Sequence, residues 1–228
     1  MKDLLFPNRC IFCGALMQAD KLICRECAAQ DIMIVGSVCK FCGLSTERCD
    51  CGKRRYFYER RIACVYYEGN VPRGIARFKF YRHTMLGVYY GRMMAQNVRS
   101  KYKDIHFDWV LYVPMRPFDR WRRGYNCAQV LAEEISKNCG IPLLLNGLYK
   151  RRRTKPQKRM KYRERAGNVA DAFSTKCADR LAGKTVLLVD DVATSGATLN
   201  ECAKILKLAG AAKVYCATMA AVPPRKNA

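Results

Sequence analysis

Two adjacent carboxylates, Asp190 and Asp191, follow a short apolar run and precede a loop of small residues. The run, residues 186–189, has no polar face, which is typical of a central parallel strand covered on both sides. Open parallel sheets bind ligands at the carboxyl ends of their strands, where both side chains are expected. The doublet is therefore the first candidate for a ligand-binding site.

The loop behind the doublet is suited to holding a phosphate. Residues 193–198 supply backbone N–H groups and hydroxyls with little side-chain bulk. We expect Thr198 and Glu201 to form a capping box for a helix over 199–208, whose N-terminal partial positive charge favours an anion. No G-K-[ST] sequence closes the loop, so it is not a Walker A motif. A plain strand–turn–helix unit with acidic surface residues is the alternative.

Paired cysteines near the N-terminus form a second candidate site. Two thiolates on one tight turn can face the same metal, and two such turns close a tetrahedral site. The pairs therefore predict two structural Zn²⁺ sites, which would stabilise a segment too short to be held by burial alone. Sequential pairing is the simplest arrangement, interleaved pairing stays open, and iron–sulfur or disulfide chemistry is the alternative. The candidate ligands are Cys10, Cys13, Cys24, Cys27, Cys39, Cys42, Cys49 and Cys51, the last two separated by one residue instead of two.

Composition limits the partners and the location. The formal net charge is +23, which favours polyanionic partners. Residues 63–228 hold 31 of the Lys and Arg side chains against 12 Asp and Glu, so the excess lies outside the cysteine-rich segment. The sequence has no signal-peptide pattern and no apolar run near the ~20 residues of a membrane span. We expect a cytoplasmic protein without a membrane span, where reduced thiols favour zinc over disulfides.

The elements that position these groups can be read from hydrophobic spacing. Strands are expected at 61–67, 109–113, 143–148 and 213–219, beside the run at 186–189, and helices at 71–80, 85–98 and 128–137. The cysteine pairs stop near residue 53. We therefore place a domain boundary between a zinc-ribbon domain at 1–58 and a larger α/β domain at 59–228.

The most basic stretch of the chain runs from residue 150 to 165, with Glu164 as its one acidic residue. Such a run is usually a solvated segment. Its place between two strands suits a lid that closes on a polyanion, or a surface that contacts nucleic-acid phosphates. The candidate nucleic-acid-binding residues are Arg151, Arg152, Arg153, Lys155, Lys158 and Arg159.

The order of these motifs resembles one family. Paired cysteines are followed by R-x-R-R-G-Y-N at 120–126, R-x-T-x-x-Q at 152–157, R-x-x-N at 165–168 and V-D-D-V-x-T-S-G-A-T at 189–198. This combination is similar to the ComF family of phosphoribosyltransferase-like proteins linked to natural competence. The resemblance implies a type I phosphoribosyltransferase fold, a parallel sheet flanked by helices, preceded by a small double zinc ribbon.

The resemblance also implies a ligand, phosphoribosyl pyrophosphate (PRPP). Asp190 and Asp191 would face the ribose hydroxyls, which ligate Mg²⁺, and Arg116 would hold the pyrophosphate together with nearby backbone amides. A proline-bracketed turn with a solvated arginine is the alternative for the Arg116 loop. The expected catalytic residues are thus Asp190, Asp191 and Arg116. The loop for the 5′-phosphate would comprise Ala193, Thr194, Ser195, Gly196, Ala197 and Thr198.

Two functions follow from the resemblance. The first is a Mg²⁺-dependent PRPP-binding protein, acting as a phosphoribosyltransferase on an unidentified acceptor, with single-stranded DNA and a competence helicase or other DNA-uptake proteins as partners. The second is a non-catalytic single-stranded-DNA-binding competence factor or scaffold that keeps the fold. Thr194 stands where purine-salvage relatives place a catalytic carboxylate, and threonine is no general base near neutral pH. Purine salvage is therefore disfavoured.

Overall fold

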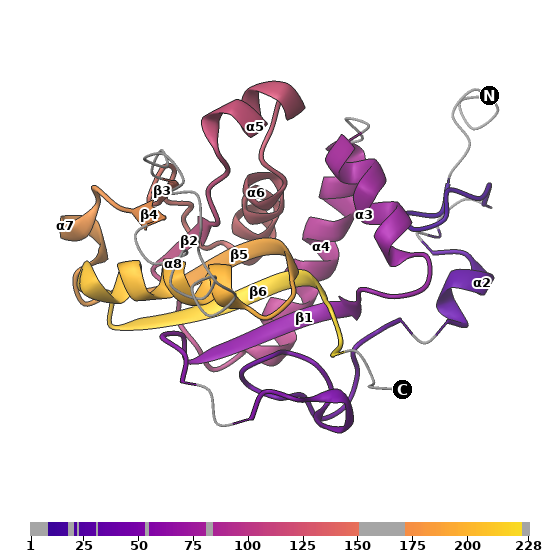
Figure 1. Cartoon of the computed structure of the whole chain (residues 1–228), viewed down its shortest axis with the longest axis horizontal. Coiled ribbons are helices and arrows are strands. Elements are labelled where there is room, and N and C mark those ends of the chain that lie inside the picture. Colours follow the sequence, from indigo (N-terminus) through magenta and orange to yellow (C-terminus); the bar gives the residue numbers. More distant parts are fainter. Residues whose placement is uncertain are drawn as a thin grey trace, which may run out of the picture.

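The computed structural model describes residues 9–17, 21, 23–30, 32–52, 55–80, 84–150 and 172–224. Its centre is a four-stranded sheet in the order β1-β6-β5-β2, with every neighbouring pair parallel (Figure 1). The strands are β1 (Arg60–Tyr66), β2 (Trp109–Tyr112), β5 (Thr185–Ala193) and β6 (Lys213–Ala221). This arrangement confirms the expected parallel sheet and puts the predicted ligand strand, β5, at an inner position.

Helices cover both faces of this sheet. On one face, Leu187 and Val189 of β5 pack into a core with α3 (Val71–Phe80), α4 (Thr84–Lys101) and α6 (Cys127–Cys139). On the other face, Val186 and Leu188 pack against α8, which spans Ala197–Leu208 (Figure 1). Alternate residues of the apolar run thus enter different cores, which explains why the run has no polar face.

The described residues of the first cysteine-rich segment, 9–17 and 23–28 with the short helix α2 (Arg25–Ala28), pack against α3 and α4. Phe12 is fully buried and stacks on Tyr90, whose hydroxyl donates to the Ile11 carbonyl at 2.7 Å. Gly74 permits this approach, because a methyl group there would lie 2.7 Å from the Ile11 carbonyl oxygen. The segment therefore shares its core with the helices (right side of Figure 1).

The second cysteine-rich segment, residues 37–52 with the turn η1 (Thr46–Arg48), lies along β1 below the sheet in Figure 1. Leu44 and Cys42 form a small buried cluster with Ala63 and Tyr66 of β1. Arg48 lies 4.1 Å over the Tyr66 ring and pairs with Glu68 at 2.5 Å. The edge strand is thereby covered, as a sheet edge requires.

The expected strand at 143–148 is wrong. Among the described residues, this stretch contributes one isolated bridge, between Leu143 and Val110. Leu144 and Leu148 are buried, but Asn146 between them has a positive φ of 53°, which interrupts any extended strand. The remaining described elements are short. They are α5 (Pro117–Arg123), the antiparallel pair β3 (Tyr149–Lys150) and β4 (Phe173–Ser174), and α7 (Ala178–Leu181).

Within the described part of the chain, no helix combines the length and the apolar character that crossing a membrane requires.

Candidate ligand site and metal centres

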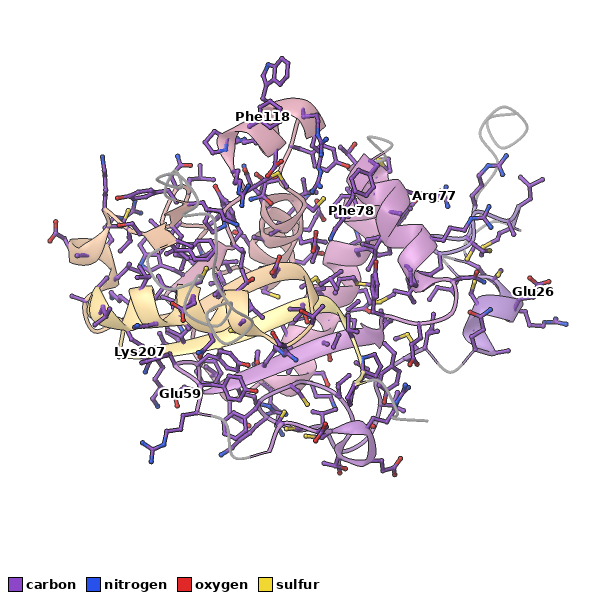
Figure 2. All side chains as sticks on the ribbon, viewed as in Figure 1. Glu26, Glu59, Arg77, Phe78, Phe118 and Lys207 are labelled. Carbon is purple, nitrogen blue, oxygen red and sulfur yellow. The ribbon has the colours of Figure 1, made fainter. Side chains whose placement is uncertain are left out.

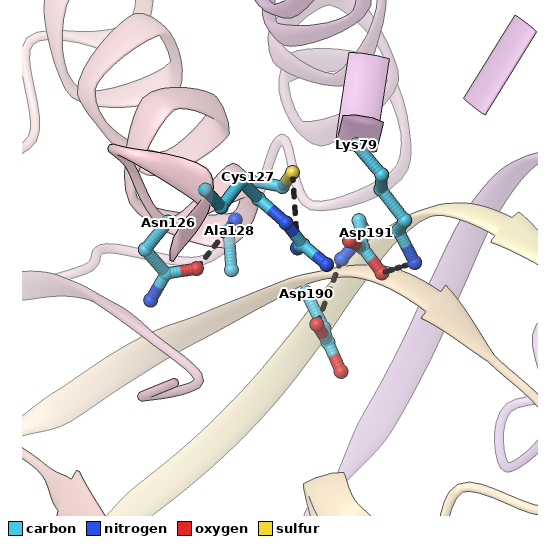
Figure 3. A network of polar contacts seen from close by, with 7 residues as sticks. Lys79, Asn126, Cys127, Ala128, Asp190 and Asp191 are labelled. Carbon is cyan, nitrogen blue, oxygen red and sulfur yellow. Dashed lines mark hydrogen bonds and ion pairs between the residues drawn. The ribbon is translucent and has the colours of Figure 1, made fainter. Parts of the chain in front are cut away.

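The carboxylate doublet lies near the carboxyl end of β5 (Figure 3). Asp191 pairs with Lys79 of α3, its Oδ1 lying 2.9 Å from the ammonium nitrogen. The Asp191 backbone N–H donates to Asp190 Oδ1 at 2.9 Å. The ion pair with Lys79 was not predicted, because it joins residues 112 positions apart in the sequence.

The two carboxylates differ in their electrostatics. Burial, together with the charge of Asp191, raises the pKa of Asp190 to about 7. Burial lowers the pKa of Lys79, but the charge of Asp191 outweighs it and the net pKa is raised. Within the part of the chain that the structure describes, Asp190 takes part in no ion pair. Asp190 is therefore the carboxylate that a bound cation would stabilise most.

The loop after β5 borders a hollow of about 100 Å³ that also includes Asp190. Thr194, Ser195, Ala197 and Thr198 are exposed, so the loop is open to a ligand instead of facing a packed interior. The structure thus brings the predicted phosphate loop and Asp190 to one hollow. The lining residues are Asp190, Val192, Ala193, Thr194, Ser195, Gly196, Ala197, Thr198 and Leu199.

The expected capping box at Thr198 and Glu201 is wrong. Helix α8 begins at Ala197, with Gly196 at the N-cap in a left-handed conformation of φ 76° and no side-chain cap. The helix therefore begins earlier in the sequence than expected. Just before it, Ser195 Oγ accepts a hydrogen bond from the Ala197 N–H at 3.4 Å. The first N–H groups of a helix have no partner inside it. An uncapped N-terminus of this kind is more available to an anion than a capped one.

Arg116 occupies the N-cap of α5, directly before Pro117, and its side chain is exposed. Burial lowers the pKa of Lys150, and the charge of Arg116 lowers it further. Lys150 of β3 in turn helps to lower the pKa of Asp190 against the effect of burial. Lys150 thus lies near enough to interact with the charges of both Asp190 and Arg116, whereas Arg116 does not line the hollow beside Asp190.

The eight N-terminal cysteines form two separate groups, each with all its sulfur atoms within 4.8 Å of one another. Cys10, Cys13, Cys24 and Cys27 form the first, and Cys39, Cys42, Cys49 and Cys51 form the second. Two Zn–S bonds of about 2.3 Å at a tetrahedral angle put their sulfurs about 3.8 Å apart. The Sγ atoms of Cys39 and Cys51 are 3.8 Å apart, and those of Cys13 and Cys24 are 3.6 Å apart.

Backbone donors favour the thiolate at one sulfur of each group, whereas burial raises the pKa of Cys13, Cys27, Cys42 and Cys51. The Cys24 N–H donates to Cys10 Sγ and the Phe41 N–H donates to Cys39 Sγ, each at 3.4 Å. Burial raises the pKa of both thiols, but N–H donors outweigh it, to about 6 for Cys10 and about 7 for Cys39. The groups fit two zinc sites with sequential pairing, which decides the arrangement that the sequence left open.

The predicted nucleic-acid-binding residues, Arg151 to Arg159, lie outside the described residues. A different surface with aromatic and basic groups is visible on α5. Phe118 and Trp121 are 67% and 79% exposed, and their ring centroids lie 6.2 Å apart. Phe118 lies at the top of the view in Figure 2. Arg120, Arg122 and Arg123 lie on the same helix. Hydrophobic spacing could not reveal this surface, because the prolines before it indicated a turn.

Two family models match the chain. A double zinc ribbon domain matches residues 1–59 and a phosphoribosyl transferase domain matches residues 122–228. "Competence protein F" of Haemophilus influenzae is 29% identical over 92% of this chain and 95% of its own length. "DNA utilization protein YhgH" of Salmonella typhimurium is 26% identical over 93% of this chain and 97% of its own length.

Among solved structures, a glutamine PRPP amidotransferase from B. subtilis, complexed with ADP and GMP, has a TM-score of 0.41 and 25% identity, and the match covers 58% of this chain and 25% of that chain.

The fold and the two cysteine centres thus define a protein with a phosphoribosyltransferase-type domain and a double zinc ribbon. Both parts occur together in relatives that match almost end to end. The expected resemblance to the ComF family is confirmed, since "Competence protein ComFC" of Bacillus subtilis is also 27% identical over 84% of this chain and 80% of its own length.

Proposed function

We propose that this protein binds PRPP with Mg²⁺ and transfers the phosphoribosyl group to an acceptor. The observation that carries the proposal is the shared hollow of Asp190 and the loop that follows it. An uncapped helix N-terminus favours a phosphate. A half-buried carboxylate that forms no ion pair with any described residue favours the cation that accompanies the phosphate.

The donor set fits Mg²⁺ together with a sugar phosphate. Mg²⁺ prefers oxygen ligands and keeps several waters, so it binds through few carboxylates plus its substrate. Asp190 would supply this oxygen charge, and the ribose hydroxyls of PRPP would complete the ligand set. The metal would neutralise charge on the pyrophosphate. Asp191, held by Lys79, would be oriented toward the ribose.

The reaction would be displacement at the ribose C1. The acceptor atom forms a bond to C1, the bond from C1 to the pyrophosphate oxygen breaks, and pyrophosphate leaves with the bonding electrons. Arg116 and Lys150 would stabilise the negative charge that develops on this leaving group. Holding the 5′-phosphate in the loop would fix C1 relative to these charges, which is the positioning contribution to the rate.

The test is Mg²⁺-dependent PRPP binding by isothermal titration, with pyrophosphate release followed by phosphorus NMR. Asp190→Asn combined with Asp191→Asn is expected to abolish binding and to leave two zinc ions per chain. Asp108→Asn is the matched control, because Asp108 contacts Thr185 at the opposite end of β5. PRPP binding that survives in the double variant would refute the assignment.

A second function, single-stranded DNA binding in DNA uptake, is favoured by the α5 surface. Aromatic rings stack on bases and cations contact phosphates in sequence-independent single-strand binding. Phe118, Trp121 and the α5 arginines combine both groups on one exposed helix. The printed names of the relatives, a competence protein and a DNA utilization protein, agree with such a role. The cytoplasm, where thiols stay reduced, would suit the zinc centres.

Fluorescence anisotropy with an oligo-dT strand tests this second function. Trp121→Ala is expected to weaken binding by about 1–3 kcal/mol, the usual contribution of one stacked base. Leu208→Ala is the control, because Leu208 is 75% exposed on α8 and offers no ring. Affinity should also fall steeply with salt. Equal affinities for the two variants would remove α5 from the DNA surface.

A further inference from the structure

Arg61 of β1 is an arginine buried inside the fold. It is 1% exposed and is among the largest fully buried side chains of the described residues. Its Nε donates to the Cys42 carbonyl at 2.9 Å, and its Nη2 donates to the same oxygen. Its backbone N–H donates to the Lys40 carbonyl at 2.7 Å. The second zinc knuckle, residues 39–43, thus anchors this side chain.

The remaining nitrogen of the guanidinium faces the phosphate loop. A methyl group on Gly196 would lie 2.7 Å from Arg61 Nη1. This nitrogen is the one buried side-chain polar atom in the described residues that has no hydrogen-bond partner. The ion pairs found among those residues do not include Arg61. A buried charge without a counter-charge is costly, so its position behind an open anion site calls for an explanation.

A second side chain, that of Tyr58, also connects the second zinc knuckle to Gly196. The Tyr58 hydroxyl donates to the Phe41 carbonyl at 2.8 Å, and a methyl group on Gly196 would lie 3.2 Å from the same hydroxyl. Successive carbonyls of the second zinc knuckle therefore hold the two side chains that back Gly196. Cys42 contributes twice, with its sulfur in the Cys₄ group and its carbonyl at Arg61.

We propose that Arg61 is a positioning residue for the phosphate loop and that the second zinc centre holds it in place. The inference rests on the proposed function, since it deepens the account of the same phosphate site. Arg61 fixes the turn at Gly196 from behind and adds positive charge to the helix N-terminus. Loss of the second zinc ion frees the carbonyls of Phe41 and Cys42 to move, and the loop loses its support.

The first zinc centre provides the matched comparison. Arg77 of α3 donates from Nη1 to the Cys10 carbonyl at 3.3 Å, so it contacts the first knuckle much as Arg61 contacts the second (Figure 2). Asn70 donates to Cys27 Sγ at 3.4 Å. These contacts join the first centre to α3 and the turn before it. They do not involve the loop after β5.

The experiment compares full-length variants by PRPP titration with Mg²⁺, zinc content and amide exchange of residues 194–199. Arg61→Met is expected to weaken PRPP binding about tenfold, equal to ~1.4 kcal/mol, and to speed amide exchange in the loop. Arg61→Lys should recover part of the affinity because it keeps the charge. Arg77→Met should change neither quantity. The inference is wrong if the two methionine variants behave alike.

A second pair of variants keeps the test decisive if Arg61→Met does not fold. Cys49→Ser removes a partly exposed ligand of the second centre, and Cys13→Ser removes one of the first. Faster loop exchange is expected for Cys49→Ser alone. Equal loop exchange in both variants overturns the inference, even if PRPP binds normally. Absence of PRPP binding in the wild type refutes the proposed function instead, and the exchange comparison still decides the link to zinc.

Discussion

Replacing Asp190 with asparagine is expected to make the folded protein more stable at high pH while removing PRPP binding. Burial and the charge of Asp191 raise the pKa of Asp190 to about 7. The folded state therefore holds a proton on this group between about pH 4 and pH 7 that the unfolded chain has already lost. The free energy of unfolding consequently falls as the pH rises through this range, and it is lowest where Asp190 is ionised.

The magnitude follows from the two pKa values. An unfolded aspartate has a pKa of about 3.9, and the folded value for Asp190 is about 7. This difference in pKa corresponds to about 4 kcal/mol in the free energy of unfolding. Asp190→Asn removes this term because an amide does not titrate. The free energy of unfolding of the variant should equal that of the wild type near pH 4. Its advantage should grow by about 1.4 kcal/mol per pH unit and level off above about pH 7.

Urea unfolding between about pH 5.5 and pH 8.5, with zinc content checked at each pH, measures this difference. Asp108→Asn is the internal control with the opposite sign. The Thr185 N–H and Lys184 hold the pKa of Asp108 below its usual value, so ionised Asp108 stabilises the fold above the unfolded pKa. That variant should lose stability by the same amount throughout this pH range, because both the unfolded and the folded pKa of Asp108 lie below it. An Asp190→Asn advantage that is absent, or that does not vary with pH, would refute the reasoning.

Three further results are expected. Gly196→Ala should abolish PRPP binding and destabilise the fold by about 1–3 kcal/mol, because φ at this residue is 76° and Arg61 leaves no room for a methyl group. Titration with PRPP measures the first effect and urea unfolding the second. Removing zinc with a chelator should release two ions per chain and lower the thermal midpoint, as a metal-indicator assay and a thermal scan would show. Lys79→Met should weaken PRPP binding by freeing Asp191 from its partner, with Arg73→Met, an exposed residue on the same helix, as the control in the titration.

Local patterns were enough to predict the sheet and the zinc ligands. The run at 186–189 had to be buried on both faces, and the structure covers it on both. The close cysteine pairs had to share metals, and only the choice between sequential and interleaved pairing needed coordinates. These features depend on residues near one another in the sequence, where spacing alone constrains geometry.

Contacts over long sequence separations could not be predicted. Arg61 opens the expected strand at 61–67, but spacing could not predict that the second knuckle packs against β1 and buries its side chain. The capping box failed because Gly196 in a left-handed conformation starts α8 before Thr198. Helix α5 was missed because Pro117, at its first position, also fits a turn. In each case the sequence permitted two conformations, and tertiary contacts selected one.

Two uncompensated charges of opposite sign flank the same loop. Among the residues that the structure describes, Asp190 has no ion pair on one side of the loop, and Arg61 has none behind Gly196 on the other. Each destabilises the fold when left alone, and a direct pair between them would have relieved both. A ligand with a bound cation and a phosphate relieves both at once, because its cation meets the carboxylate and its phosphate meets the loop. A lone anion or a lone cation would compensate one of the two charges, whereas a magnesium-bound sugar phosphate would compensate both.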